Sequence, residues 1–181
     1  ETHTAAPLNV YGQTKWEGEQ AVANHCAKHL IFRTSWVYAA RGHNFAKTML
    51  RLAKERDSLS VIDDQIGAPT GAELLADVTA LALRQIQQFN GGDLTGLYHL
   101  VAGGHTSWHG FASFVIDHAL KAGVSLQVQS NAIKKIATSE YTTAAKRPLN
   151  SRLNTDKVQT AFNITLPTWQ VGVERMLTEI L

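Results

Sequence analysis

The sequence predicts an α/β fold, because runs with strand character alternate with segments of helical periodicity. Three short apolar runs each neighbour a longer amphipathic segment: 30–32 after 8–28, 59–62 before 71–89, and 96–101 before 108–122. A strand-length run cannot bury its apolar face alone, and a helical stripe placed next to it in the chain offers a natural cover. We therefore expect sheets covered by helices.

The first helix is expected over residues 8–28. Pro7 restricts the backbone at its entry, and helical spacing makes four residues candidates for burial: Trp16, Ala21, Val22 and Cys26. The run Leu30-Ile31-Phe32 is rich in residues that favour strands, so it predicts a short buried strand. Residues 41–44 read as a turn into a helix at 44–55, for which Asn44 is a candidate N-cap.

The middle of the chain continues the alternation. Residues 59–62 predict a strand, and the following loop ends at Thr70, a candidate cap for the helix at 71–89. Asp63 and Asp64 in that loop are expected to be solvated turn residues, because consecutive loop carboxylates seldom face one point. Glu73 falls in the first helical turn, where a carboxylate is favoured by the helix dipole.

Turn, strand and helix signals repeat in the last half. We expect these elements, in order: a turn at 90–93, a strand at 96–101, a helix at 108–122, an edge strand at 126–129, a helical turn at 131–136, a helix at 154–162 and a helix at 168–181. Thr168 is a candidate cap for the last helix. Lys146 and Arg147 precede Pro148 in a weakly periodic loop that could supply cations to a diphosphate.

Composition excludes several classes of function. The 181 residues carry a formal net charge of +2, too small to indicate binding to nucleic acid or an anionic membrane. The longest apolar stretch, 74–83, is far shorter than the ~20 residues of a membrane-spanning helix. Cys26 is the single cysteine, so a reducing compartment is expected, with the cytoplasm as the default. Histidine pairs four residues apart lack further ligands, so no metal site is predicted.

The stretch with the clearest chemistry is Tyr11-Gly12-Gln13-Thr14-Lys15. Residues four apart on a helix share a face, so the phenol and the ammonium can converge on one spot. An ammonium favours the phenolate form of a neighbouring phenol, which makes a tyrosine a better proton donor near neutral pH. Tyr11 is therefore a candidate general acid and Lys15 its partner.

The sequence around this pair resembles the catalytic helix of extended short-chain dehydrogenases that act on nucleotide sugars. Within that group the chain is similar to the dTDP-4-dehydrorhamnose reductase family. Matching stretches run through its whole length: Phe32-Arg33-Thr34-Ser35-Trp36-Val37-Tyr38, Asn44-Phe45-Ala46-Lys47-Thr48-Met49-Leu50, Asp64-Gln65-Ile66-Gly67-Ala68-Pro69-Thr70-Gly71, Gly96-Leu97-Tyr98-His99-Leu100 and Arg147-Pro148-Leu149-Asn150-Ser151-Arg152-Leu153.

The resemblance implies the C-terminal part of a Rossmann-type parallel sheet with a smaller α/β substrate-binding lobe. Residues 1–35 and 71–102 would belong to the Rossmann-type domain, and 36–70 and 103–181 to the lobe. No glycine-rich phosphate loop follows a strand-like run, so we expect the chain to be the C-terminal portion of a longer enzyme and inactive by itself.

The resemblance also implies roles for individual residues. The catalytic residues would be Tyr11 and Lys15, and both would contact the cofactor together with Thr34 and Ser35. Five residues would contact the substrate: Trp36, Asn44, Phe45, Gln65 and Arg147. Trp36 could instead be a buried core aromatic, and Asn44 could be only the N-cap of its helix.

The implied reaction is reduction of dTDP-4-dehydro-β-L-rhamnose to dTDP-β-L-rhamnose by NADPH or NADH, in dTDP-rhamnose biosynthesis. The resemblance leaves a homodimer open. Two alternatives also stay open: a non-catalytic regulatory subunit of an S-adenosylmethionine synthetase, and a sugar-nucleotide epimerase or dehydratase of the same superfamily. Retention of Tyr11, Lys15 and Trp36 favours an enzyme over the regulatory subunit, and the stretches around Trp36 and at 64–71 fit an epimerase or dehydratase less well.

Overall fold

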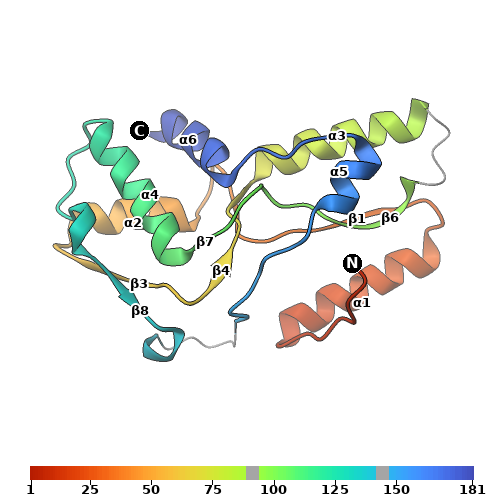
Figure 1. The fold of residues 1–181 in the computed structure, drawn as a ribbon, viewed down its shortest axis with the longest axis horizontal. Helices are drawn as coiled ribbons and strands as arrows, with labels where there is room; N and C mark the ends of the chain where they lie inside the picture. The colour runs from red at the N-terminus through yellow and green to blue at the C-terminus, as the bar shows by residue number, and fades with distance from the viewer. Residues whose placement is uncertain (89–93, 142–146) are drawn as a thin grey trace.

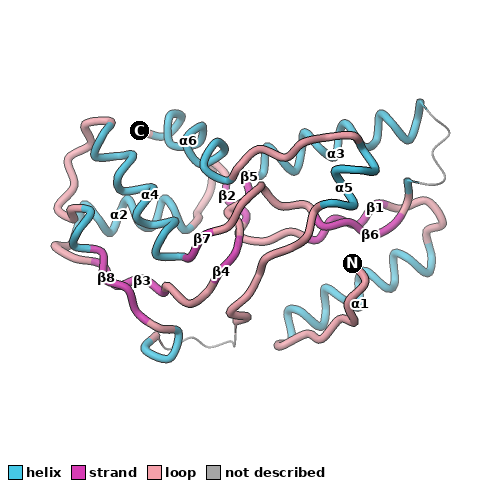
Figure 2. The backbone as a smooth tube through the Cα atoms, viewed as in Figure 1, coloured by secondary structure: helices cyan, strands magenta, loops and turns pink. Residues whose placement is uncertain are grey.

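A computed structural model describes residues 1–88, 94–141 and 147–181, and it confirms the α/β fold class. The chain is elongated, with two groups of elements at opposite ends (Figure 1). One group contains α1 (Val10–His25), β1 (Leu30–Arg33), α3 (Ala72–Gln88), β6 (Gly96–His99) and α5 (Asp156–Phe162). The other contains α2 (Phe45–Glu55), β3 (Leu59–Ile62), α4 (Trp108–Lys121) and β8 (Ile133–Ile136). The last helix, α6 (Trp169–Ile180), lies beside α4 (Figure 2).

The first group is built on a parallel pair of strands. β1 and β6 run side by side from Leu30 opposite Gly96 to Arg33 opposite His99. Apolar side chains of α3 and α5 pack with those of the strands into one cluster, because each helix turns its apolar stripe toward the pair. The fully or largely buried members of this smaller core are Val78, Ala82, Tyr98, Leu100, Val158, Phe162 and Leu166.

Helix α1 differs from its expected packing. Its first turn is capped by Asn9, whose side chain accepts from the Gly12 amide at 2.8 Å. Within the described chain no residue of α1 is buried, so the predicted burial of Trp16, Ala21, Val22 and Cys26 is wrong. Helical spacing identifies an apolar face, but it cannot say whether another element covers that face.

The second group holds the larger core. β3 and β8 pair in parallel, with Leu59 opposite Ile133 and Ile62 opposite Ile136. Helix α4 packs against both strands, and α2 and α6 pack against α4 in the same core. Helix α2 is strongly amphipathic. The most deeply buried side chains of α4 and α6 in this core are Phe111, Ala112, Val115, Ile116, Ala119, Val173 and Leu177.

Two short strand pairs lie between the cores. β2 (Val37–Tyr38) runs parallel to β5 (Thr70–Gly71), and β4 (Ile66–Gly67) runs antiparallel to β7 (Thr106–Ser107). A single bridge also pairs Ile66 with Asn150. These crossings bring segments that are far apart in sequence to the loop between β3 and β4.

Several local predictions are wrong. Residues 126–129 form no strand, because the Gln127 and Val128 amides donate to the Ala53 carbonyl at the end of α2. The expected helical turn at 131–136 is a 3₁₀ turn, Ser130–Ala132, followed by β8. Strand formation there depends on β3, which lies more than sixty residues earlier in the chain.

Two predicted caps are also wrong. Thr70 lies in β5, with its hydroxyl donating to the Ala68 carbonyl at 3.0 Å, so it does not cap α3. Thr168 occupies the N-cap position of α6, but within the described residues its side chain makes no capping hydrogen bond. The predicted turn at 90–93, the last residue expected in the helix at 71–89 and Lys146 lie outside the described residues.

Candidate functional site

Tyr11 and Lys15 share a face of α1, as their spacing predicted. The Lys15 ammonium lies 5.5 Å from the centre of the Tyr11 ring, within the range of a cation–π contact. The Tyr11 side chain is open to solvent, with 72% of its surface exposed. The pair is therefore assembled by local helical geometry and is accessible to a ligand.

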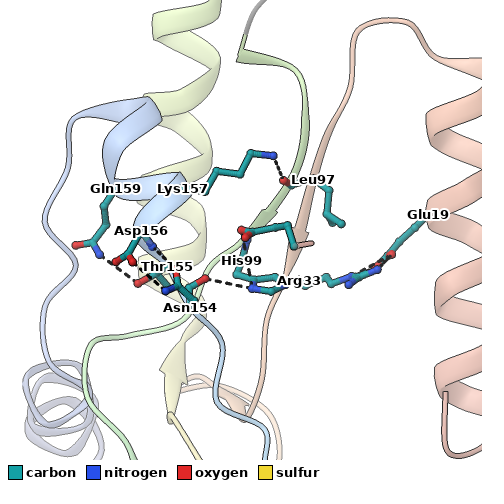
Figure 3. A network of polar contacts seen from close by, with 10 residues as sticks. Glu19, Arg33, Leu97, His99, Asn154, Thr155, Asp156, Lys157 and Gln159 are labelled. Atoms are coloured by element: carbon teal, nitrogen blue, oxygen red, sulfur yellow. Dashed lines mark hydrogen bonds and ion pairs between the residues drawn. The ribbon is translucent and has the colours of Figure 1, made fainter. Parts of the chain in front are cut away.

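Lys15 also lines a surface hollow of about 250 Å³, which we call the lysine hollow. Arg33 and Glu19 line the same hollow and form a two-armed ion pair, with Arg33 Nη2 2.6 Å from Glu19 Oε2. This pair joins α1 to the end of β1 (Figure 3). The hydrogen bonds that Arg33 donates to the Glu19 carboxylate raise the pKa of Arg33, so the guanidinium stays charged. The ion pair thereby holds Lys15 near the carboxyl end of β1.

The carboxyl end of β6 lies next to that of β1. His99 hydrogen-bonds through Nδ1 to the Asn154 carbonyl at 3.1 Å, which ties β6 to the segment leading into α5 (Figure 3). Burial lowers the pKa of His99, which favours the neutral ring. Neighbouring parallel strands thus end together, where open α/β sheets bind ligands.

The residues after β1 leave the sheet through an unusual backbone conformation. Thr34 is exposed, and the Ser35 hydroxyl oxygen is buried without a hydrogen-bond partner in the described part of the chain. Trp36 has a φ of 51°, in the left-handed region that large side chains seldom adopt.

The Trp36 indole is half-buried between two partners. It stacks on Trp108, with ring centres 3.7 Å apart and planes 12° from parallel. It also lies directly against Gly67, where an added Cβ atom would come within 2.6 Å of Trp36 Cε2. Only glycine therefore leaves room for this position of the indole.

Trp108 is part of the wall of a second hollow of about 280 Å³, which we call the aromatic hollow. Its lining comes from α2, β3, the β3–β4 loop, the start of α4 and the segment after β8. The lining residues are Phe45, Met49, Ser60, Val61, Ile62, Gln65, Trp108, Tyr141 and Arg147. Aromatic surface with one amide and one guanidinium suits a planar or ring-shaped ligand that carries negative charge.

The tertiary structure gathers three of the predicted substrate-binding residues here, namely Phe45, Gln65 and Arg147. Trp36 reaches this group through its stack on Trp108. Asn44 does not line the hollow: its side chain caps α2 by accepting from the Lys47 amide and donates to the Ala39 carbonyl at 2.6 Å. Tyr11 and Lys15 lie on α1, outside the aromatic hollow.

Sequence reasoning missed Trp108 and Tyr141 as lining residues. Trp108 was assigned only to the beginning of a helix, and Tyr141 fell in a segment of weak periodicity. A sequence signal for Trp108 did exist: it directly follows Ser107, the N-cap of α4. The Ser107 side chain accepts from the Gly110 amide at 2.9 Å. Such a residue lies at a helix start that faces a loop, a common place for a binding side chain.

The loop carboxylates are not simply solvated, as was expected from the sequence. Asp63 accepts from the Ser107 hydroxyl at 2.5 Å and pairs with Lys135 at 2.9 Å. Asp64 accepts from both the amide and the hydroxyl of Thr138, at 3.0 and 2.6 Å. Both carboxylates therefore fasten the β3–β4 loop to distant segments.

The comparison with protein families identifies the family of the chain. The model of the RmlD substrate binding domain matches residues 1–181. The chain belongs to this family. Curated relatives of the RmlD chain include the dTDP-4-dehydrorhamnose reductases of Shigella flexneri, 61% identical, and of Escherichia coli K12, 60% identical. Each alignment covers 99% of this chain and 59% of the relative, so the RmlD chain spans about three-fifths of their length.

Solved structures agree with the RmlD fold. The dTDP-4-dehydrorhamnose reductase of Bacillus anthracis, solved in complex with NADP, is 36% identical with a TM-score of 0.83. It is matched over 99% of this chain and 58% of its own length. UDP-glucose 4-epimerase of Brucella ovis aligns with a TM-score of 0.69 at 15% identity, which shows a shared fold alone.

Two further properties of the described residues concern membrane spanning and metal binding. In residues 1–88, 94–141 and 147–181, no helix has both the length and the apolar character needed to span a membrane. The same residues contain no group of three or more histidine, cysteine or acidic side chains arranged to hold a metal ion. His109, one of the paired histidines, instead bonds through Nε2 to the Ile133 carbonyl at 3.1 Å.

Proposed function

We propose that the protein carrying this chain reduces the C4 ketone of dTDP-4-dehydro-β-L-rhamnose to give dTDP-β-L-rhamnose, with NADPH or NADH as the reductant. One observation carries the proposal: the chain is 60–61% identical, over nearly all its length, to reductases named for this reaction. Two epimerases and one dehydratase of known structure resemble it at 12–18% identity, and so support the fold without supporting their own reactions.

Tyr11 is the proposed proton donor. Reduction of a ketone by hydride leaves an alkoxide at C4, and a neighbouring acid must supply a proton to that oxygen. The Tyr11 side chain is open to a ligand, and the Lys15 ammonium lies 5.5 Å from the centre of its ring. The proton returns to Tyr11 from solvent after product leaves.

The residues near the end of β1 fit the nicotinamide end of a dinucleotide. Bound there, the reduced nicotinamide supplies the hydride. The Lys15 ammonium in the lysine hollow can donate to the ribose hydroxyls, and the buried Ser35 hydroxyl has no partner in the described chain and so can serve a polar ligand atom. Thr34, exposed next to Ser35, is the third proposed contact.

The aromatic hollow is the proposed site for the nucleotide part of the substrate. Phe45, Trp108 and Tyr141 offer ring faces, and Arg147 offers a guanidinium that can pair with a diphosphate. Trp36, stacked behind Trp108, extends this aromatic surface toward β1. Asn44 is proposed to act on the site only by capping α2, because both ends of its amide are already bonded.

A stoichiometric assay tests the reaction. The complete natural protein is mixed with dTDP-4-dehydro-L-rhamnose and NADPH, and oxidation of the cofactor is followed together with sugar-nucleotide chromatography. A reductase consumes one NADPH for each dTDP-L-rhamnose formed. Interconversion of sugar nucleotides without net loss of NADPH would instead indicate an epimerase, and no reaction at all would refute the proposal.

The remaining expectations accompany this function. We propose that residues 1–35 and 71–102 form the remainder of the cofactor-binding domain and that 36–70 and 103–181 form the substrate lobe, with one amendment. Val158 and Phe162 of α5 pack in the smaller core with β6 and α3, so α5 is better placed with the first domain. A cytoplasmic location is proposed from the single exposed cysteine, Cys26. The homodimer stays a prediction.

A further inference from the structure

A chain of hydrogen bonds runs from the aromatic hollow to the loop carboxylate Asp64. The indole nitrogen of Trp108 donates to Gln65 Oε1 at 3.2 Å, and Gln65 Nε2 donates to the Thr138 hydroxyl at 3.1 Å. The Thr138 hydroxyl then donates to Asp64 Oδ1 at 2.6 Å. The four side chains come from the β3–β4 loop, the start of α4 and the 3₁₀ turn after β8, Thr138–Glu140.

The direction of every bond in this chain follows from its two ends. An indole N–H can only donate, so the oxygen of the Gln65 amide must face Trp108 and its NH₂ group must face Thr138. An ionised carboxylate can only accept, so the single hydroxyl proton of Thr138 points to Asp64. Bonds aligned head to tail polarise one another, which favours this one arrangement.

Because the Gln65 amide is buried, its orientation depends on keeping both of its hydrogen-bond partners. Its side chain is only 3% exposed, although it lines the aromatic hollow. A buried amide that loses one partner must turn to find another, because an unpaired buried polar group is costly. Turning Gln65 would remove the acceptor of the Trp108 indole, which stacks on Trp36 and also contacts Phe45 with ring centres 4.6 Å apart.

Thr138 and Asp64 are the two members of this hydrogen-bond series that lie outside the hollow, and Thr138 connects Asp64 to Gln65. Its hydroxyl is the only bridge between Gln65 and Asp64 within the described residues, while its backbone amide binds Asp64 independently at 3.0 Å. Removing the hydroxyl therefore leaves the turn attached to the loop but leaves the Gln65 NH₂ group without its acceptor. The Thr138 side chain reaches the hollow by way of Gln65. Its backbone carbonyl also accepts from the amide of Tyr141, another lining residue, and a substitution by valine leaves that backbone bond in place.

We propose that Thr138 is a positioning residue, whose hydroxyl sets the orientation of the Gln65 amide and, through it, the Trp108 and Trp36 surface that receives the nucleotide sugar. This inference rests on the proposed function of the aromatic hollow. It gives the paired Asp64 and Thr138 a role in substrate affinity beyond fastening two loops together.

The test compares Thr138→Val with Thr138→Ser in the complete natural protein. Valine matches threonine in size but lacks the hydroxyl, whereas serine keeps it. Binding of dTDP-L-rhamnose is measured by calorimetry, and KM and kcat by steady-state kinetics. Thr178→Val is the matched control, because the Thr178 hydroxyl donates only to the Glu174 carbonyl on the exposed face of α6.

Loss of one buried hydrogen-bond acceptor should raise the Kd for dTDP-L-rhamnose about tenfold in Thr138→Val. KM for the sugar nucleotide should rise in parallel, with KM for NADPH and kcat little changed. Thr138→Ser and Thr178→Val should bind as the unmodified protein does. Gln65→Met, which removes both amide bonds, should weaken binding at least as much, and adding Thr138→Val to it should cause no further loss.

Three results would overturn the inference. Unchanged affinity in Thr138→Val, failure of serine to restore affinity, or additive losses in the double variant would each show that Thr138 does not act through Gln65. If Thr138→Val fails to fold, an unchanged affinity in Gln65→Met would overturn the inference equally. Failure of the unmodified protein to bind dTDP-L-rhamnose is a separate outcome, which would refute the proposed function itself.

Discussion

Replacing Gly67 by alanine tests whether the aromatic stack is as tightly packed as the structure indicates. The added Cβ atom would lie 2.6 Å from Trp36 Cε2 and 2.9 Å from two further indole atoms, whereas ordinary contacts begin at 3.4 Å. The indole must therefore move by about 3.4 − 2.6 = 0.8 Å. One of its faces is already occupied by Trp108 at 3.7 Å, so the movement disturbs the stack.

Overpacking of this kind costs about 1–3 kcal/mol of unfolding free energy. For a protein of this size each kcal/mol corresponds to roughly 2–4 °C, so the Gly67→Ala variant should melt roughly 2–12 °C lower. The same displacement should weaken binding of dTDP-L-rhamnose, because Trp108, on which Trp36 stacks, lines the aromatic hollow. Thermal melting followed by circular dichroism and calorimetric titration measure the two effects on one sample.

Gly18→Ala is the matched control for this change. Gly18 lies in α1, and nothing comes within 4 Å of its added Cβ atom. Alanine in a helix interior is more stable than glycine by about 0.5–1 kcal/mol, so this variant should melt slightly higher. A Gly67→Ala variant with the stability and affinity of the unmodified protein would refute the claim that Gly67 is required by the position of Trp36.

The remaining predictions concern three side chains. Tyr11→Phe should lower kcat about 10²–10⁴-fold while dTDP-L-rhamnose still binds, and steady-state kinetics with near-normal kcat would remove Tyr11 from the mechanism. Trp36→Ala should weaken that binding yet cost less than the ~3–5 kcal/mol of a fully buried aromatic; a larger loss of stability with normal affinity would make Trp36 a core residue. Burial disfavours the Asp63 charge, but hydrogen bonds from Ser107 and Lys135 prevail and hold the pKa of Asp63 below its usual value. The ionised Asp63 carboxylate should therefore contribute fully to the unfolding free energy above the unfolded-state pKa near ~3.9, and this contribution should be lost as pH falls through the lower folded-state pKa. Denaturant unfolding between these two pKa values should show a flatter dependence of stability on pH in Asp63→Asn. Identical pH dependence in the variant and the unmodified protein would contradict this role of Asp63.

The helices and the first strands were predictable from the sequence because their signals are local. Periodic apolar residues in 44–55 and 108–122 predicted α2 and α4 to within a residue or two, since a helix makes its hydrogen bonds within its own segment. The Tyr11–Lys15 pair follows from the same geometry, because residues four apart on any helix are neighbours.

Strand pairing and the covering of faces were decided by the tertiary structure. Residues 133–136 become β8 because β3 offers its edge, and 126–129 do not become a strand because α2 offers a carbonyl instead. Neither partner is visible in the local sequence. Likewise, helical spacing predicted buried positions in the first helix, but within the described chain no residue of α1 is buried.

The aromatic hollow could be predicted only in part. Phe45, Gln65 and Arg147 were named from the resemblance, whereas Trp108 and Tyr141 joined them through strand crossings between distant segments. The sequence by itself determined which residue types were available and which helical neighbours they had. The packing of α2, β3, the β3–β4 loop, the start of α4 and the segment after β8 decided which side chains share a surface. Such contacts depend on closing long stretches of chain.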